Sequence, residues 1–213
     1  RSIGALTGIE NLRGTAFDDS LTGDAAANTF HYVEGFDTVV GGLGHDVLDM
    51  SAFGSALWVN LCVVGAPHAW TQDDIDLVGG TWRALVDVDG VEEVVGGALG
   101  DTLIGSTADE TLRGGGGDDL LDGGGGSNIL DGGAGSGDTA VFSARSDAYS
   151  FALNGTDILV TNAAGETDAV QNTVEKLQFA EITVTYDQVV AALTNPLMFT
   201  ANADTVTLPF LGG

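Results

Sequence analysis

The chain has 213 residues, with 31 Asp and Glu against six Lys and Arg, and a formal net charge of -25. This acidity excludes nucleic acid and anionic membrane as partners, because both bind basic surfaces. Hydrophobic residues make up 44% of the chain, more than a disordered acidic tail carries, so we predict a folded protein with solvated or cation-neutralised carboxylates. No apolar run is long enough for a transmembrane segment. The single cysteine, Cys62, excludes an internal disulfide and is compatible with a buried thiol.

Residues 1–50 contain a first array of short repeats. On a nine-residue period they follow the pattern G-G-x-G-x-D-x-U-x, in which U is a large apolar residue. The copies cover residues 14–22, 23–31, 32–40 and 41–49, and the last of them reads GGLGHDVLD. The first six positions predict a turn, since glycine permits left-handed dihedrals, and the last three predict a short strand.

Residues 51–95 break this period. Apolar residues alternate from Leu57 to Val64, which predicts a half-buried strand. A loop around 67–76 and a second strand over 82–88 should follow, as a β segment that packs beside the repeats or continues them. Trp58, Trp70 and Trp82 recur every twelve residues. They either pack in the core or form an exposed aromatic platform for a glycan or another partner.

Residues 96–142 form a second array, with copies at 96–104, 105–113, 114–122 and 123–131 and a last one that begins at residue 132. Residues 6–30 align with residues 88–112 at an offset of 82, which indicates a duplication. The segments IENL (9–12) and VEEV (91–94) lead into the two arrays, and VEKL (174–177) is an isolated third copy. In the last repeat Gly137 stands where Asp is expected and Asp138 follows one residue late. We expect the array to end there, because such a slip reverses the faces of a strand.

Residues 143–199 contain little glycine and predict a flanking, antiparallel β-rich cap over the open end of the repeats. Asn154-Gly155 is a strong hairpin signal between two apolar stretches. Further strands are expected over 174–179 and 182–185, and Asp187 could cap a short helix over 188–193. Residues 200–213 resemble the start of another block, so we expect the chain to be a segment of a longer protein.

The repeats supply hard oxygen ligands without His or Cys, which is the donor set that calcium prefers. Two nonapeptides make one coil of a right-handed parallel solenoid, so each repeat stacks on the second one after it at roughly 4.8 Å. The side chains paired in this way are Asp19 with Asp37, Asn28 with Asp46, Asp101 with Asp119, Glu110 with Asn128, and Asp119 with Asp138. Pairs that contain Asn28, Asn128 or Glu110 should bind weakly or not at all, and Asp101 with Asp119 should bind best.

One apolar residue from each repeat should point inward and form a thin core, from Leu21, Phe30, Val39, Leu48, Leu103, Leu112, Leu121 and Leu130. Unneutralised carboxylates on neighbouring coils would repel one another across so small a core. We therefore expect folding and the binding of several calcium ions to be one event.

The nonapeptides resemble the repeats-in-toxin (RTX, hemolysin-type) family, and residues 36–144 are similar in layout to the C-terminal region of serralysin-like proteins. The resemblance implies that the Asp at the sixth position and the carbonyls of the turn ligate calcium. It places carboxylate ligands at Asp19, Asp37, Asp46, Asp101, Asp119 and Asp138. The corresponding carbonyls belong to Gly14, Ala16, Gly41, Leu43, Gly96, Ala98, Gly105, Thr107, Gly114, Gly116, Gly123, Gly125, Gly132 and Ala134.

The family resemblance implies a non-catalytic module that folds on meeting extracellular calcium and supports the secretion, by the type I route, and the stability of neighbouring domains. The alternative is a ligand- or glycan-binding module of a secreted or cell-surface adhesin or surface-layer protein, and a remoter one is an accessory domain of a secreted hydrolase. His31, His45 and His68 have no metal-ligand spacing, and surface or packing roles are expected for them.

Overall fold

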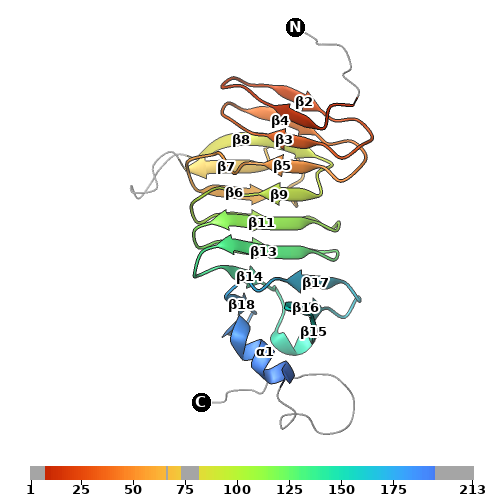
Figure 1. Cartoon of the computed structure of the whole chain (residues 1–213), viewed down its shortest axis with the longest axis vertical. Coiled ribbons are helices and arrows are strands. Elements are labelled where there is room, and N and C mark those ends of the chain that lie inside the picture. Colours follow the sequence, from red (N-terminus) through yellow and green to blue (C-terminus); the bar gives the residue numbers. More distant parts are fainter. Residues whose placement is uncertain (1–7, 66, 73–81, 195–213) are drawn as a thin grey trace.

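The computed structural model describes residues 8–65, 67–72 and 82–194, and nearly all of its elements are strands in two sheets (Figure 1). Sheet A contains, in spatial order, β1 (Asn11–Arg13), β3 (Thr29–His31), β5 (Val47–Asp49), β9 (Glu93–Val95), β11 (Thr111–Gly116), β13 (Ile129–Ala134), β17 (Thr167–Val170), β16 (Asp157–Thr161) and β15 (Ser150–Asn154). Sheet B contains β2 (Ser20–Thr22), β4 (Asp37–Val40), β8 (Trp82–Asp89), β7 (Ala69–Gln72), β6 (Leu57–Asn60), β10 (Thr102–Ile104), β12 (Leu120–Asp122), β14 (Thr139–Val141), β18 (Lys176–Gln178) and β19 (Thr183–Thr185). The protein is an all-β, parallel β-roll.

Within each repeat array, successive strands alternate between the two sheets, and each strand pairs in parallel with the strand that follows it in its own sheet. Leu12 lies beside Phe30 in sheet A, and Leu103 lies beside Leu121 in sheet B. Each of these steps spans 18 residues, which is two nonapeptides. The expected coil of two repeats is therefore present.

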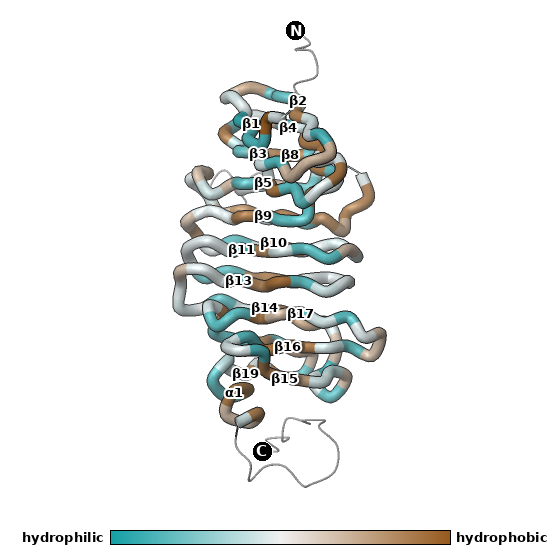
Figure 2. Tube along the Cα trace, turned by 45° about the vertical axis from the view of Figure 1, so that its right-hand side comes forward, coloured by the Kyte–Doolittle hydropathy of each residue, from teal (hydrophilic) through white to brown (hydrophobic). Residues whose placement is uncertain are grey.

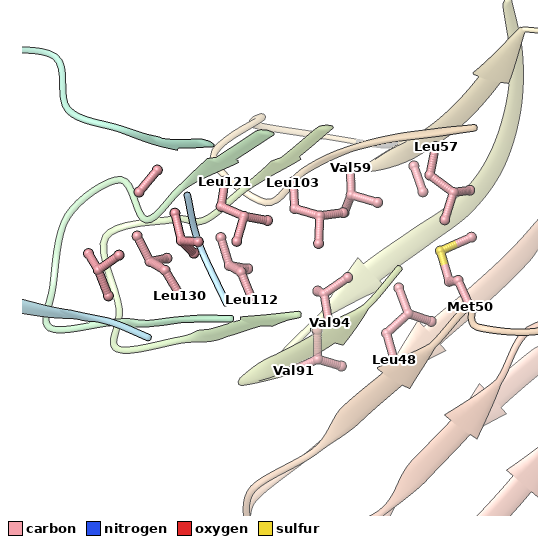
Figure 3. Close-up of a cluster of buried hydrophobic side chains, with 14 of the residues drawn as sticks. Leu48, Met50, Leu57, Val59, Val91, Val94, Leu103, Leu112, Leu121 and Leu130 are labelled. Atoms are coloured by element: carbon pink, nitrogen blue, oxygen red, sulfur yellow. The ribbon is translucent and has the colours of Figure 1, made fainter. Parts of the chain in front are cut away.

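The core is a row of apolar side chains between the sheets (Figure 3). The predicted inward residues Phe30, Val39, Leu48, Leu103, Leu112, Leu121 and Leu130 are at most 2% exposed. Leu21, near the N-terminal end of the roll, is partly buried against them. Most repeat strands have only three or four residues, so most of them contribute a single fully buried side chain.

The two predicted arrays are one continuous solenoid. In sheet A, β9 pairs in parallel with β5 on one side and with β11 on the other, so no break separates the arrays there. In sheet B, the single strand that one coil requires is replaced by three: β8 pairs in parallel with β4, β6 pairs in parallel with β10, and β7 joins them antiparallel. The segment predicted at 51–95 thus continues the solenoid, and it places two additional strands in one sheet.

Several details of this segment differ from the sequence prediction. The first strand ends at Asn60 instead of continuing to Val64, and β7 occupies part of the predicted loop, of which residues 73–76 lie outside the described residues. Cys62 is exposed and is not a buried thiol. The described tryptophans do not belong to the buried core: Trp58 and Trp70 are half-buried, and Trp82 is 55% exposed.

The solenoid does not end at the slipped repeat, which corrects the prediction. The additional residue is absorbed in the turn, so Thr139 and Ala140 of β14 still lie beside Leu120 and Leu121 of β12. The parallel strand pairing then continues in both sheets, because β17 pairs with β13 and β18 pairs with β14. A turn tolerates an additional residue that a strand would not, since only in the strand does the residue count decide which face is buried.

The antiparallel cap follows the prediction in outline. The hairpin forms as expected, with Gly155 and Thr156 connecting β15, which ends at Asn154, to β16, and β19 pairs antiparallel with β18. The helix α1 (Tyr186–Thr194) begins before Asp187, so Asp187 lies in its first turn and does not cap it. The cap is Thr185, whose hydroxyl accepts a bond from the Gln188 N–H at 3.2 Å while the Gln188 amide oxygen accepts from the Thr185 N–H at 2.9 Å.

No helix in the described part of the chain has the length and apolar character needed to cross a membrane. The tail predicted to start another block, 200–213, lies outside the described residues.

Candidate calcium sites in the turn ladders

The glycines of each turn serve two different needs. In several turns the second and fourth positions have left-handed dihedrals, as at Gly115 (φ 103°) and Gly117 (φ 105°), which a side chain would strain. The first position needs space instead. A Cβ built on Gly96 would lie 2.6 Å from Asp101 Oδ2 and would also collide with the carbonyl oxygen of Gly114 in the next coil. The first glycine therefore leaves a small cradle of oxygen atoms open.

The five predicted side-chain pairs are all brought together. In each pair the backbone N–H of one residue donates to the side-chain oxygen of its partner in the next coil. The donor-to-acceptor distances are 3.0 Å for Asp19 to Asp37, 2.7 Å for Asn28 to Asp46, 2.7 Å for Asp101 to Asp119, 2.9 Å for Glu110 to Asn128 and 2.7 Å for Asp119 to Asp138. The side chains thus form two ladders, one along each row of turns.

One oxygen of several ladder aspartates has no partner. Oδ1 accepts the N–H bond just described, whereas the buried Oδ2 atoms of Asp37, Asp46, Asp119 and Asp138 accept no hydrogen bond. These four residues are at most 2% exposed. A buried carboxylate oxygen without a donor or a counter-charge costs several kcal/mol of folding free energy. Bound cations would remove this cost, so the residues present fit calcium.

Burial also shifts the titration of these groups. It raises the pKa of Asp119 to about 7 and that of Asp101 to about 6, and it raises the pKa values of Asp37, Asp46 and Asp138 as well. The cause is desolvation, which disfavours the charged form, and it outweighs the backbone N–H bonds that favour it.

The first-position glycines Gly41, Gly96, Gly105, Gly114, Gly123 and Gly132 are buried and Gly14 is half-buried, so their cradles face the interior of the turns. The predicted third-position ligands lie further out. Ala16, Leu43, Ala98, Thr107 and Ala134 are exposed, and Gly116 and Gly125 are half-buried. Two of their carbonyls already accept hydrogen bonds, that of Ala134 from the Gly117 N–H and that of Gly125 from the Asn128 amide.

In the pairs predicted to bind weakly, the side chains of Asn28, Glu110 and Asn128 have hydrogen-bond partners within the protein. Asn28 Oδ1 accepts from the Asp24 N–H and Nδ2 donates to the Ile9 carbonyl. Both carboxylate oxygens of Glu110 contact Ser106, and the Asn128 amide donates to Asp168 at 2.8 Å. These residues have no unpartnered oxygen that would require a cation.

Three acidic residues on the ladders were missed at the sequence level. Glu92 accepts the Asp46 N–H at 2.8 Å, Glu175 accepts the Asp138 N–H at 2.9 Å, and Asp168 accepts the Asn128 N–H at 3.1 Å. Glu92 and Glu175 belong to the VEEV and VEKL segments, whose similarity to each other was the available signal. Asp168 lies in a strand of the cap, and its place beside Asn128 depends on the pairing of β17 with β13.

The histidines have protein partners or lie at the surface. His31 Nδ1 lies 2.8 Å from Asp49, His68 Nδ1 lies 3.0 Å from Asp87, and His45 is exposed. Among the described residues, no group of three or more His, Cys, Asp and Glu side chains converges as a metal cluster. Calcium also accepts main-chain carbonyls as ligands, and the cradles offer them beside the ladder carboxylates.

Comparison with known proteins supports this interpretation. A family model described as the RTX calcium-binding nonapeptide repeat (4 copies) matches residues 5–39, 31–49 and 104–138. No curated protein matches the chain. Among solved structures, the extracellular lipase LipA from Serratia marcescens aligns with 86% of this chain at 14% identity, with a TM-score of 0.21, too low to establish a common fold. The chain spans 40% of the length of that lipase. The parallel coil, the stacked aspartates and the family match together identify residues 5–49 and 104–138 as RTX calcium-binding nonapeptide repeats.

Proposed function

We propose that this calcium-binding module is a folding switch in a larger secreted protein. It stays unfolded where calcium is scarce and folds into the β-roll at extracellular calcium concentrations. The unfolded state would support type I export, and the folded module would then stabilise the neighbouring domains. The module acts through its structure and carries out no reaction of its own.

The buried, unpartnered oxygens of Asp37, Asp46, Asp119 and Asp138 are the observation that carries this proposal. Without a cation the folded state must hold these carboxylates in a dry environment, and against neighbours of like charge. With a cation, the same oxygens contribute binding free energy that only the folded chain can use, so calcium binding drives folding.

The ions would be held mainly by the ladder aspartates and the first-position carbonyls. We expect the pairs that contain Asp19, Asp37, Asp101, Asp119 and Asp138 to bind more tightly than the pair of Glu110 and Asn128. Calcium would supply the positive charge that joins one coil to the next. The chain supplies the oxygens, the turns that hold them and the core that fixes the spacing of the coils.

A calcium titration followed by far-ultraviolet circular dichroism tests the proposal. We expect β-structure to form cooperatively at about 0.1–1 mM calcium, the range of extracellular calcium modules. Magnesium at the same concentrations is the control, because it demands a smaller octahedral site and should not substitute. A chain that is fully folded in calcium-free buffer and binds no calcium would contradict the proposal.

A second candidate function, recognition of a glycan at a cell surface, is favoured by the aromatic group on β6, β7 and β8. The Trp58 ring centre lies 4.9 Å from that of Trp70 and 6.0 Å from that of Trp82. Trp82 is 55% exposed, so part of this group can stack on a planar apolar face such as that of a sugar ring.

Replacing Trp82 with alanine separates the two candidates. If the group recognises glycans, W82A loses fluorescence-detected binding to a panel of soluble oligosaccharides while its calcium-dependent circular dichroism stays unchanged. Phe17, which is 79% exposed in the first array, provides a matched control as F17A. Equal behaviour of W82A and the wild type toward every sugar leaves calcium-driven folding as the only function supported.

A further inference from the structure

The coil at the junction of the two arrays has an unusually short turn. Val40 pairs with Asp89 and Val47 pairs with Glu93, so the turns between these positions lie one above the other. The upper turn is the repeat Gly41–Asp46, with six residues, whereas the lower turn has only Gly90, Val91 and Glu92. A non-repeat turn is therefore stacked against the last repeat of the first array.

This short turn presents oxygens to the repeat above it. Asp46 is 0% exposed, its N–H donates to Glu92 Oε2 at 2.8 Å, and its Oδ2 has no partner. A Cβ built on Gly41 would lie 2.7 Å from Asp46 Oδ2 and would collide with the carbonyl oxygen of Gly90. In the second array, Gly96 has the same relation to Asp101 and to the carbonyl of Gly114. The cradle of a repeat pair is thus reproduced although only one partner is a repeat.

We infer that a calcium ion binds at this junction, held by Asp46, by the Gly90 carbonyl and by Glu92. The inference rests on the proposed function, because it assumes that the repeat cradles take calcium. Glutamate suits this position since its longer side chain compensates for a turn that has three residues fewer. The site would join the first array to the inserted strands across 46 residues of sequence.

The same arrangement recurs at the other end of the solenoid. Asp138 is 0% exposed, its N–H donates to Glu175 Oε2 at 2.9 Å, and its Oδ2 has no partner. A Cβ built on Gly132 would lie 2.5 Å from the Thr173 carbonyl oxygen and 2.6 Å from Asp138 Oδ2. A second ion therefore binds between Asp138, the Thr173 carbonyl and Glu175. Glu92 of the VEEV segment and Glu175 of the VEKL segment thus complete a site at the end of an array, where the next repeat is absent.

The short turn of the junction site lines a cavity. This cavity has a volume of about 440 Å³, and Gly90, Glu92, Ser106, Glu110 and His68 are among the residues that line it. The acidic side chains at its wall would attract a cation toward the cradle.

The test is the number of calcium ions bound per chain, measured by elemental analysis. The protein is first equilibrated with calcium at roughly 5–10 times the concentration that saturates folding. Relative to the wild type, Glu92→Gln should lose one ion, Glu175→Gln should lose one, and the double variant should lose two. Glutamine keeps an oxygen that can accept the aspartate N–H, so the ladder hydrogen bond is retained while the charge is removed.

Glu10→Gln is the matched control. Glu10 occupies the position equivalent to Glu92 at the offset of 82, but its side chain is exposed, and the amide of Asn28 in the next coil is already hydrogen-bonded. This variant should bind as many ions as the wild type. If Glu92→Gln and Glu175→Gln fold and retain the full number of ions, the inference is wrong, although the repeats still bind calcium.

Anomalous diffraction from calcium-soaked wild-type crystals keeps the test decisive if the variants do not fold. A peak between Asp46, the Gly90 carbonyl and Glu92 is the expected result. Peaks at the repeat cradles without one at this junction would overturn the inference alone. A chain that shows no calcium anywhere would overturn the proposed function instead.

Discussion

At the scale of single residues, the ladder aspartates combine two roles in one carboxylate. One oxygen accepts a backbone N–H from the preceding coil and so fixes the stacking, as Asp119 does for Asp101 at 2.7 Å. In Asp37, Asp46, Asp119 and Asp138 the other oxygen points into the cradle left by the first glycine and accepts no hydrogen bond. The sixth position must therefore be short and acidic, and the first position must lack a side chain.

The raised pKa values predict that acid stabilises the calcium-free fold. The folded-state pKa is about 7 for Asp119 and about 6 for Asp101, against about 3.9 in an unfolded chain, so the folded state binds protons more tightly. This contribution to stability is fully present below about pH 4 and is lost as the pH rises through about 6–7. Far-ultraviolet circular dichroism in calcium-free buffer should therefore show more β-structure at pH 5 than at pH 8.

Calcium should reverse this dependence. Protons and calcium compete for the same carboxylates, so at saturating calcium the Tm should rise from pH 5 to pH 8. A calcium-free chain that is folded to the same extent at both pH values would show that these aspartates are not buried in the folded state.

At the scale of elements, each repeat strand is too short to be stable alone. A strand such as β12 buries one residue, Leu121, and leaves Leu120 and Asp122 half-buried on the outer face. Its stability comes from the parallel strands on both sides, β10 and β14, and from the row of leucines between the sheets. Core packing and calcium binding are therefore coupled, since both require correctly stacked coils.

Leu121→Ala should destabilise the calcium-bound protein by about 2–5 kcal/mol, because it opens a cavity in the middle of the core. It should also raise the calcium concentration at the folding midpoint. Urea unfolding at fixed calcium, followed by circular dichroism, measures the first effect and a calcium titration measures the second.

Leu120→Ala is the control for this change, because it removes the same atoms from the outer face of the same strand. It should cause a clearly smaller loss. Equal losses for the two variants would mean that the inward row is not the core that holds the coils together.

At the scale of the whole molecule, the roll is a stack of coils (Figure 2), and the strands of each coil pair with those of the neighbouring coils. The inserted strands β6, β7 and β8 are part of this stack, because β8 continues the first array and β6 continues into the second. The cap closes the far end, where α1 packs against β15 and β19. Since the strand pairing runs without a break through sheet A, from β5 through β9 to β11, the arrays should fold as a single unit.

Two optical signals can test this unity. Trp58, Trp70 and Trp82 all lie on the inserted strands, so tryptophan fluorescence reports on the junction, whereas far-ultraviolet circular dichroism reports on the entire chain. We expect both signals to change at the same calcium concentration in one titration. Two separated transitions would show that the arrays bind calcium and fold independently.

The repeat positions alone determined the coil, the inward row and the five ladder pairs, because a strict nine-residue period leaves little choice of register. The same reasoning failed for the end of the second array, because the turn before Asp138 absorbs the additional residue and the strand pairing continues, and it failed at Cys62, which no pattern places.

Only the tertiary structure showed that the two arrays are continuous and that Glu92, Asp168 and Glu175 join the ladders. These residues come from turns and strands outside the repeat, and they are separated from their partners by 37 to 46 residues. A local pattern specifies contacts at a fixed spacing. Contacts across an insertion depend on which strand edges remain to be paired, and that is decided only when the whole sheet assembles.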